Sequence, residues 1–222
     1  MTKIIYFLGI DGSGKSTLSQ YLTNQLISRE FRVKHIWWLE GEQTFFRNFI
    51  RNINKQGKNL KINKEKKYNK KISISLIKII YPYIVLLDYL FFIIKRLYLQ
   101  AVRYDIIVID RSMYDTIFSL TNEFDISEKK EKFFYKIFQW FLPSPKIIFI
   151  IEVSSNVAYD RRREDFKSIK DVSHLLSRYE ALYSIIEKLN PGKIIRVNNM
   201  ADLKNSKKKV FEKTLFILEE YK

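Results

Sequence analysis

The stretch GIDGSGKST, residues 9–17, matches the phosphate-binding pattern G-x-x-x-x-G-K-[ST]. Gly12 and Gly14 can adopt backbone angles that are closed to other residues, so the chain can wrap around a phosphate. The wrapped N–H groups and the start of the following helix both favour an anion. The stretch therefore predicts a site for the phosphates of a nucleotide.

The side chains of this loop suggest how it would hold ATP. Lys15 is expected to reach the outer phosphates, and Ser16 is expected to help hold Mg²⁺. Mg²⁺ and ATP are therefore the expected cofactor and phosphoryl donor. The predicted ATP-binding residues are Gly9, Asp11, Gly12, Ser13, Gly14, Lys15, Ser16 and Thr17.

The segments on either side of the loop supply the context that the pattern needs. Residues 3–8, KIIYFL, form an apolar run typical of a buried strand. Residues 16–27 carry Leu18, Leu22 and Leu26 at helical spacing. A strand, the loop and a helix thus follow one another, as a phosphate-binding loop requires.

Composition narrows the class of protein. The chain has 222 residues, enough for one domain with a proper core, and no cysteine, so disulfides and cysteine chemistry are excluded. The apolar N-terminal run leads straight into the loop and does not resemble a targeting segment. We expect a cytoplasmic enzyme.

The net charge of +16 is distributed unevenly. Residues 47–78 contain eleven Lys or Arg and one acid, Glu65. This segment is either a solvated loop, a funnel for a phosphorylated substrate, or a patch for nucleic acid or an anionic membrane. Few aromatic residues interleave the lysines, which disfavours binding to single-stranded nucleic acid.

Apolar strands alternate with helices along the rest of the chain. Further strands are predicted at 33–38, 105–110, 146–153 and 193–197, and helices at 44–53, 113–142 with a break at 123–127, 156–163, 172–189 and 203–221. Residues 55–71 are expected to form a loop. Within the apolar segment 72–102 the longest stretch without a basic residue is 79–94, which is too short for a membrane span, so a core helix is expected.

This alternation is typical of a parallel sheet with helices on both faces. Ligands bind such sheets beyond the carboxyl ends of the strands. Asp110 ends one predicted strand, where an acid can hold Mg²⁺ opposite Ser16, and Arg111 follows, where a guanidinium can bind two phosphate oxygens. Alternatively, Arg111 and Asp115 simply form a pair on a helix.

Three motifs together resemble the thymidylate kinases, which are P-loop nucleoside monophosphate kinases. They are GIDGSGKST at 9–17, VIDR at 108–111 and AYDRRRED at 158–165. The resemblance implies an α/β P-loop NTPase fold with a five-stranded parallel sheet, helices on both faces and a lid at about 161–171. It also implies a single domain over 1–222, with 47–78 as an insertion on the acceptor side, and a homodimer.

The resemblance also implies roles for individual residues. The Asp-Arg pair lies near Mg²⁺ and the acceptor phosphate, and the acid in the loop contacts the sugar of the acceptor. The lid brings arginines to the ATP side. The implied catalytic residues are Lys15, Asp110, Arg111, Arg161 and Arg163; the acceptor-binding residues are Asp11, Glu40, Arg111 and Tyr114; the metal-binding residues are Ser16 and Asp110.

The sequence departs from the family where the base is recognised. After the second strand the family has Arg-Glu-Pro-Gly-Gly, whereas this chain has WWLEGEQ at 37–43, in which only Glu40 and Gly41 correspond. The family's later Ala-Tyr-Gln is also missing after Arg111. Phosphate chemistry is thus better supported than the identity of the base.

The expected function is ATP-dependent phosphoryl transfer to a nucleoside monophosphate, with dTMP to dTDP as the leading case. One alternative is a deoxynucleoside kinase, because IDRS is similar to the Glu-Arg-Ser motif of those enzymes and RRRED to their lid. Glu40 would then accept the proton of the sugar hydroxyl. A second alternative is a non-catalytic nucleotide-binding protein that docks to nucleic acid or membrane through 47–78.

Overall fold

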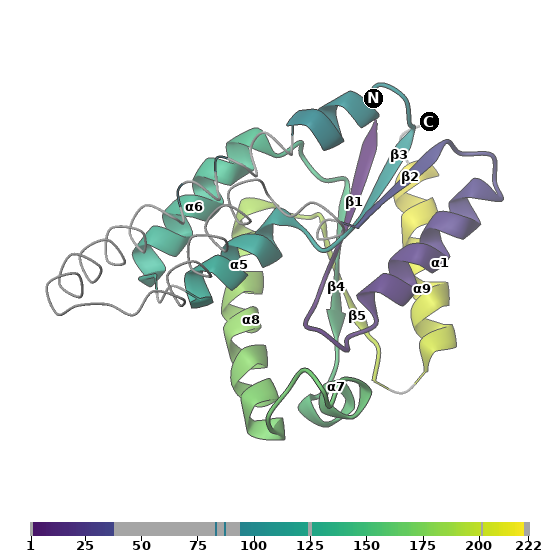
Figure 1. Cartoon of the computed structure of the whole chain (residues 1–222). Coiled ribbons are helices and arrows are strands. Elements are labelled where there is room, and N and C mark those ends of the chain that lie inside the picture. The colour runs from purple at the N-terminus through teal and green to yellow at the C-terminus, as the bar shows by residue number, and fades with distance from the viewer. Residues whose placement is uncertain are drawn as a thin grey trace, which may run out of the picture.

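The computed structural model describes residues 2–37, 83, 87, 94–123, 126–200 and 202–219. Its centre is a sheet of five parallel strands in the order β2-β3-β1-β4-β5 (Figure 1). The strands are β1 Lys3–Leu8, β2 Val33–Trp37, β3 Ile106–Asp110, β4 Ile147–Glu152 and β5 Ile194–Asn198. The predicted five-stranded parallel sheet is therefore confirmed.

Helices cover both faces of this sheet (Figure 1). Among the described residues, one group of helices packs on one face and a second group on the other. The first group is α1 Lys15–Ile27 and α9 Leu203–Glu219; the second is α5 Met113–Glu123, α6 Glu128–Phe141 and α8 Ile169–Leu189. A short α7, Ser155–Arg161, follows β4, and a π-helical turn η1, Ile94–Tyr98, continues into α4, Leu99–Ala101.

The alternation of side chains along the strands creates two cores. Tyr6 and Ile107 pack in the core beneath α5, α6 and α8. Phe7 and Val108 point to the other face and pack beneath α1 and α9. Since Asp110 lies two residues after Val108, its side chain belongs to the α1 face, where the loop at 9–17 also lies.

The predicted elements differ from the observed ones mainly at their ends. α8 begins at Ile169, inside the segment 164–170 that lacks apolar periodicity, because the Oγ of Ser168 caps it by accepting a hydrogen bond from the Asp171 N–H at 3.2 Å. α7 ends at Arg161 rather than at 163. The predictions for 44–53, 55–71 and the basic segment 47–78 fall outside the described residues.

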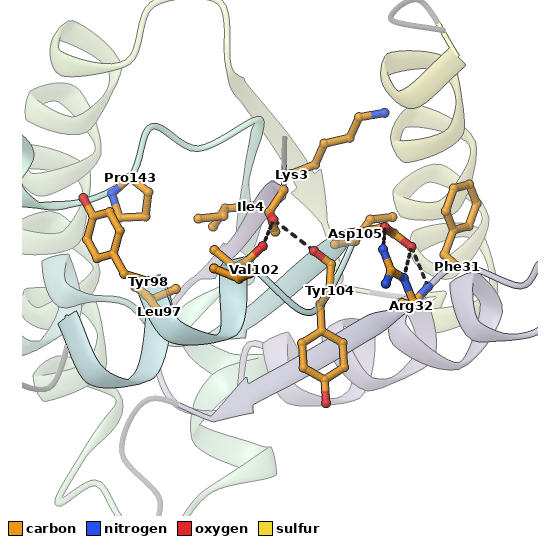
Figure 2. Close-up of a pocket in the computed structure, with 13 residues that line it drawn as sticks. Lys3, Ile4, Phe31, Arg32, Leu97, Tyr98, Val102, Tyr104, Asp105 and Pro143 are labelled. Carbon is orange, nitrogen blue, oxygen red and sulfur yellow. Dashed lines mark hydrogen bonds and ion pairs between the residues drawn. The ribbon is translucent and has the colours of Figure 1, made fainter.

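A pocket of about 570 Å³ lies at the amino ends of β1 and β3, beside η1 and α4 (Figure 2). Its Arg32 forms a two-pronged bond with Asp105, through Nε at 3.1 Å and Nη2 at 2.7 Å, which ties the start of β2 to the start of β3. Lys3 donates to the carbonyl of Leu218 at 3.2 Å. These cations already have partners within the protein, and the pocket lies at the end of the sheet opposite to the phosphate-binding loop, so we assign it a structural role.

Candidate phosphate-transfer site

The loop between β1 and α1 is shaped by its glycines. Gly12 and Gly14 have φ angles of 82° and 90°, in the left-handed region that favours glycine, and Gly14 is the N-cap of α1. The N–H of Ser13 donates to the carbonyl of Ile10 at 3.1 Å and closes a tight turn. The loop therefore ends directly on the N-terminus of a 13-residue helix, where an anion is favoured.

A pocket of about 240 Å³ opens over this loop at the carboxyl ends of the strands. It is small, largely polar in its chemistry, and bordered by four basic side chains. The lining residues are Asp11, Gly12, Gly14, Lys15, Ser16, Thr17, Trp37, Arg111, Arg161 and Arg162. A polyanion is the ligand class that such a lining suits.

Lys15 and Arg111 meet at the carboxylate of Asp11. The Lys15 ammonium donates to Asp11 Oδ1 and to the carbonyl of Ile10, each at 3.1 Å, and the Arg111 guanidinium donates to the same Asp11 oxygen. Burial alone would raise the pKa of Asp11, but the charges and hydrogen bonds of Lys15 and Arg111 outweigh it and lower the pKa. A cation from the start of α1 and a cation that follows β3 are thus held side by side by one carboxylate.

Arg111 reaches this position through an unusual backbone conformation. Its φ is 63°, in the left-handed region, where a residue with a side chain costs about 1–2 kcal/mol. The residue follows β3 immediately, so the turn aims its side chain back over the sheet edge toward Asp11. Strain of this kind is concentrated at functional sites, which fits a ligand-binding role for Arg111.

Asp110 and Ser16 offer oxygen ligands on the same face of the sheet. Asp110 is 2 % exposed, and its Oδ1 has no hydrogen-bond partner among the described residues. No group of three or more His, Cys, Asp or Glu in the described ranges is placed to hold a metal. Mg²⁺ takes one or two protein oxygens and completes its shell with waters and substrate phosphates, so Asp110 and Ser16 fit this ion.

The start of α5 uses Asp115 as a cap. Its Oδ2 accepts from the Ser112 N–H at 2.8 Å, as the acid of a capping box does, while the Ser112 Oγ accepts from the Tyr114 N–H at 3.1 Å. Asp115 also accepts from the Tyr179 hydroxyl at 3.4 Å. Within the described residues Asp115 therefore bonds Ser112 and Tyr179, whereas Arg111 bonds Asp11.

Tyr114 lies away from the pocket. The side chain is 1 % exposed, its ring packs edge-on against Tyr6, and its hydroxyl bonds Gln139 and Asn190. The structure thus places this predicted acceptor-binding residue in the core, with its polar atom already satisfied. It does so because Tyr114 falls on the face of α5 that packs against the sheet.

The arginines that end α7 point in different directions. Arg161 donates to the carbonyl of Gly12 at 3.2 Å and to that of Asn199 at 3.1 Å, so it lies against the loop. Arg162 also lines the pocket and pairs with Asp165 at 3.5 Å. Arg163 pairs with Asp160 at 2.8 Å on the surface. Of the two arginines to which the resemblance assigns a role, Arg161 lines the pocket and Arg163 does not.

The structure thus gathers most of the residues singled out from the sequence around one pocket. Glu40 lies outside the described residues, and Gly9, Ser13 and Asp110 are buried and do not line the pocket. Sequence reasoning missed Trp37 and Arg162 on the lining, and Asn199 beneath the loop. Trp37 and Asn199 were detectable in principle, since each stands at the carboxyl end of a strand, where ligand sites of parallel sheets lie.

The parallel sheet, its strand order and the loop that joins β1 to α1 define a P-loop NTPase-like α/β fold. One solved structure with this fold is the thymidylate kinase from Ehrlichia chaffeensis, which matches over 98% of both chains with a TM-score of 0.55 and 18% sequence identity. No family model matches the chain, and no curated protein matches it in sequence. None of the helices in the described part of the chain is long and apolar enough to cross a membrane.

Proposed function

We propose that this chain is a kinase that transfers the γ-phosphoryl group of ATP to a nucleoside monophosphate, with dTMP as the first acceptor to test. The observation that carries the proposal is the convergence of Lys15 and Arg111 on Asp11 at the mouth of the loop. One cation comes from the donor loop and the other from the end of β3. Two phosphate-binding groups side by side suit a reaction that joins two phosphates.

Each residue then has a defined task. The loop N–H groups and Lys15 bind the β- and γ-phosphates of ATP, and Arg111 binds the acceptor phosphate. Arg161 neutralises charge on the donor side of the same pocket. Because phosphoryl transfer asks little covalent chemistry of the protein, alignment and charge neutralisation supply the rate.

Ser16 and Asp110 would hold Mg²⁺, which neutralises charge on the ATP phosphates when it is bound. Asp11 has a second task in this proposal. Its carboxylate holds Lys15 and Arg111 at the pocket, and a phosphate that enters competes with it for both cations. The predicted contact of Asp11 with the acceptor sugar remains part of the proposal.

The direct test is consumption of ATP across the common nucleoside monophosphates and nucleosides, with the products identified by mass. A diphosphate formed from dTMP, or from another monophosphate, is the expected result and identifies the base. A monophosphate formed from a nucleoside would replace the proposal with the deoxynucleoside kinase alternative. If every acceptor fails while ATP still binds, the proposal of a nucleoside monophosphate kinase is wrong.

Lys15→Ala is the variant that links this activity to the loop. Lys15 is 5 % exposed and lines the phosphate pocket, so removal of its ammonium group should lower turnover at least about 100-fold while the fold persists. Lys129→Ala removes the same charge from the exposed surface of α6 and serves as the matched control. Turnover of Lys15→Ala at the level of that control would contradict the proposed role.

A further inference from the structure

Asn199 lies directly after β5 and beneath the phosphate-binding loop. Its side chain is 2 % exposed, and its Nδ2 donates to the carbonyl of Ser13 at 2.8 Å, across 186 positions of sequence. Its backbone N–H donates to the carbonyl of Glu152 at 2.9 Å, at the end of β4. The amide is thus held in place by the sheet and reaches into the loop from below.

The Ser13 carbonyl belongs to the same peptide plane as the N–H of Gly14. In a trans peptide these two groups point in opposite directions, and the described chain has no cis peptide. A Ser13 carbonyl that is drawn toward Asn199 therefore turns the Gly14 N–H away from Asn199. Gly14 lines the pocket above the loop, so its N–H is turned toward the phosphate position.

The packing around Gly14 shows how close this contact is. A Cβ atom at Gly14 would lie 2.4 Å from Asn199 Nδ2, so the loop accepts the amide only because residue 14 is a glycine. Asn199 Oδ1 is buried with no hydrogen-bond partner among the described residues, which costs free energy. Burial of this side chain is therefore better explained by the hydrogen bond that its Nδ2 donates to Ser13 than by the needs of the amide itself.

Asn199 also connects the loop to the end of α7. Its backbone carbonyl accepts from Arg161 Nη2 at 3.1 Å, and Arg161 Nη1 donates to Gly12 at 3.2 Å. The carbonyls of Gly12 and Ser13 therefore each accept a hydrogen bond from a side chain, one from Arg161 and one from Asn199. Asn199 therefore holds both the peptide plane of Ser13 and the side chain of Arg161, which borders the pocket.

We propose that Asn199 is a positioning residue, which holds the Ser13 carbonyl out of the phosphate-binding loop and thereby directs the Gly14 N–H at the bound phosphate. This inference rests on the phosphate-binding part of the proposed function and does not depend on the acceptor. The ligand class is the polyphosphate of a nucleoside triphosphate. The residue acts through the backbone of the loop and touches no reacting atom.

The test measures binding of inorganic tripolyphosphate and of ATP to the full chain by calorimetry. Asn199→Ala should weaken both ligands by a similar factor of about tenfold, which corresponds to about 1.4 kcal/mol. Asn199→Asp, which keeps the size but faces the Ser13 carbonyl with a carboxylate, should weaken them at least as much. Asn198→Ala is the matched control, because Asn198 is exposed and its side chain bonds Met200 N–H rather than the loop.

A second measurement begins with the wild-type chain, in which the amide resonance of Gly14 should shift strongly when tripolyphosphate is added; this part does not depend on the folding of a variant. In Asn199→Ala the shift should be lost, whereas a merely structural role of Asn199 would leave the shift unchanged. Wild-type binding with an unshifted Gly14 amide, or wild-type affinity in both Asn199 variants, would overturn the inference and leave the proposed function intact. Failure of the wild type to bind either ligand would overturn both.

Discussion

Asp115 is a buried carboxylate whose ionisation should set part of the pH dependence of stability. Burial raises its pKa from 3.8 to about 6, although Lys15, the Ser112 N–H and Arg111 oppose the rise. Because the folded pKa lies above the unfolded one, folding favours the protonated form. The free energy of unfolding should therefore fall as pH rises from about 4 to 6, by up to about 3 kcal/mol, and stay lowered above that range.

Asp115→Asn tests this expectation. The amide oxygen can still accept from the Ser112 N–H and keep the cap of α5, while the buried charge is gone. At pH 8 we expect the variant to be more stable than wild type by about 1–3 kcal/mol in urea unfolding, with the difference shrinking toward pH 4. Asp171→Asn, at an exposed position on α8, should change stability by less than about 0.5 kcal/mol. A variant that is less stable than wild type at pH 8 would show that the charge is needed.

Experiments on the end of α7 and the connection to α8 can distinguish the roles of Arg161 and Arg163. Arg161 lies against the loop, whereas Arg163 is paired with Asp160 on the surface and reaches the donor only if residues 162–168 move. We expect Arg161→Ala to lower kcat about 100-fold, since it removes a charged donor from the pocket. Arg163→Ala should stay within about fivefold of wild type, as for an exposed ion pair. An equal loss in both variants would instead indicate that this connection closes over ATP as a lid.

The helices and strands of this chain differ in how well they can be predicted from the sequence. The central strands β1, β3 and β4 could be predicted to within a residue or two because a buried parallel strand is an almost unbroken apolar run, as in IIVID at 106–110, whereas the edge strands VKHIW and IIRVN each carry a charged residue. The start of α8 was less accessible, because the signal lies in the single cap Ser168 and not in apolar spacing. Helix starts depend on one hydrogen bond, whereas strands depend on many apolar side chains.

The candidate site shows the same division. The loop at 9–17 and the Asp-Arg pair at 110–111 are local patterns that follow strands, so their neighbours in sequence are enough to suggest them. Asn199 is different, because its partner Ser13 lies 186 positions away and neither residue belongs to a motif with the other. The core position of Tyr114 likewise follows from its packing against Tyr6 on β1, which no local pattern contains.

The molecule as a whole exposes several apolar side chains where η1 and α4 meet the end of α6, and the Tyr98 hydroxyl of η1 donates to the Phe141 carbonyl of α6 at 3.0 Å. We refer to this surface as the α4–α6 face. Its exposed apolar residues are Tyr98, Leu99, Val102, Phe133, Trp140 and Phe141. Trp140 is 90 % exposed and Val102 85 %, and large apolar side chains exposed together on one side of a molecule are typical of an interaction site.

We expect this α4–α6 face to form the interface of the homodimer that the resemblance implies. A twofold interface buries the same apolar patch on both copies. One charged substitution therefore places two like charges in the interface, and neither charge has an oppositely charged partner there. Trp140→Glu should therefore shift the chain from dimer to monomer in sedimentation velocity at micromolar concentration. Phe216→Glu, at a 59 % exposed position on α9 across the sheet, is the matched control and should leave the dimer intact. A wild type that sediments as a monomer, or a Trp140→Glu dimer as stable as the control, would exclude this face as the interface.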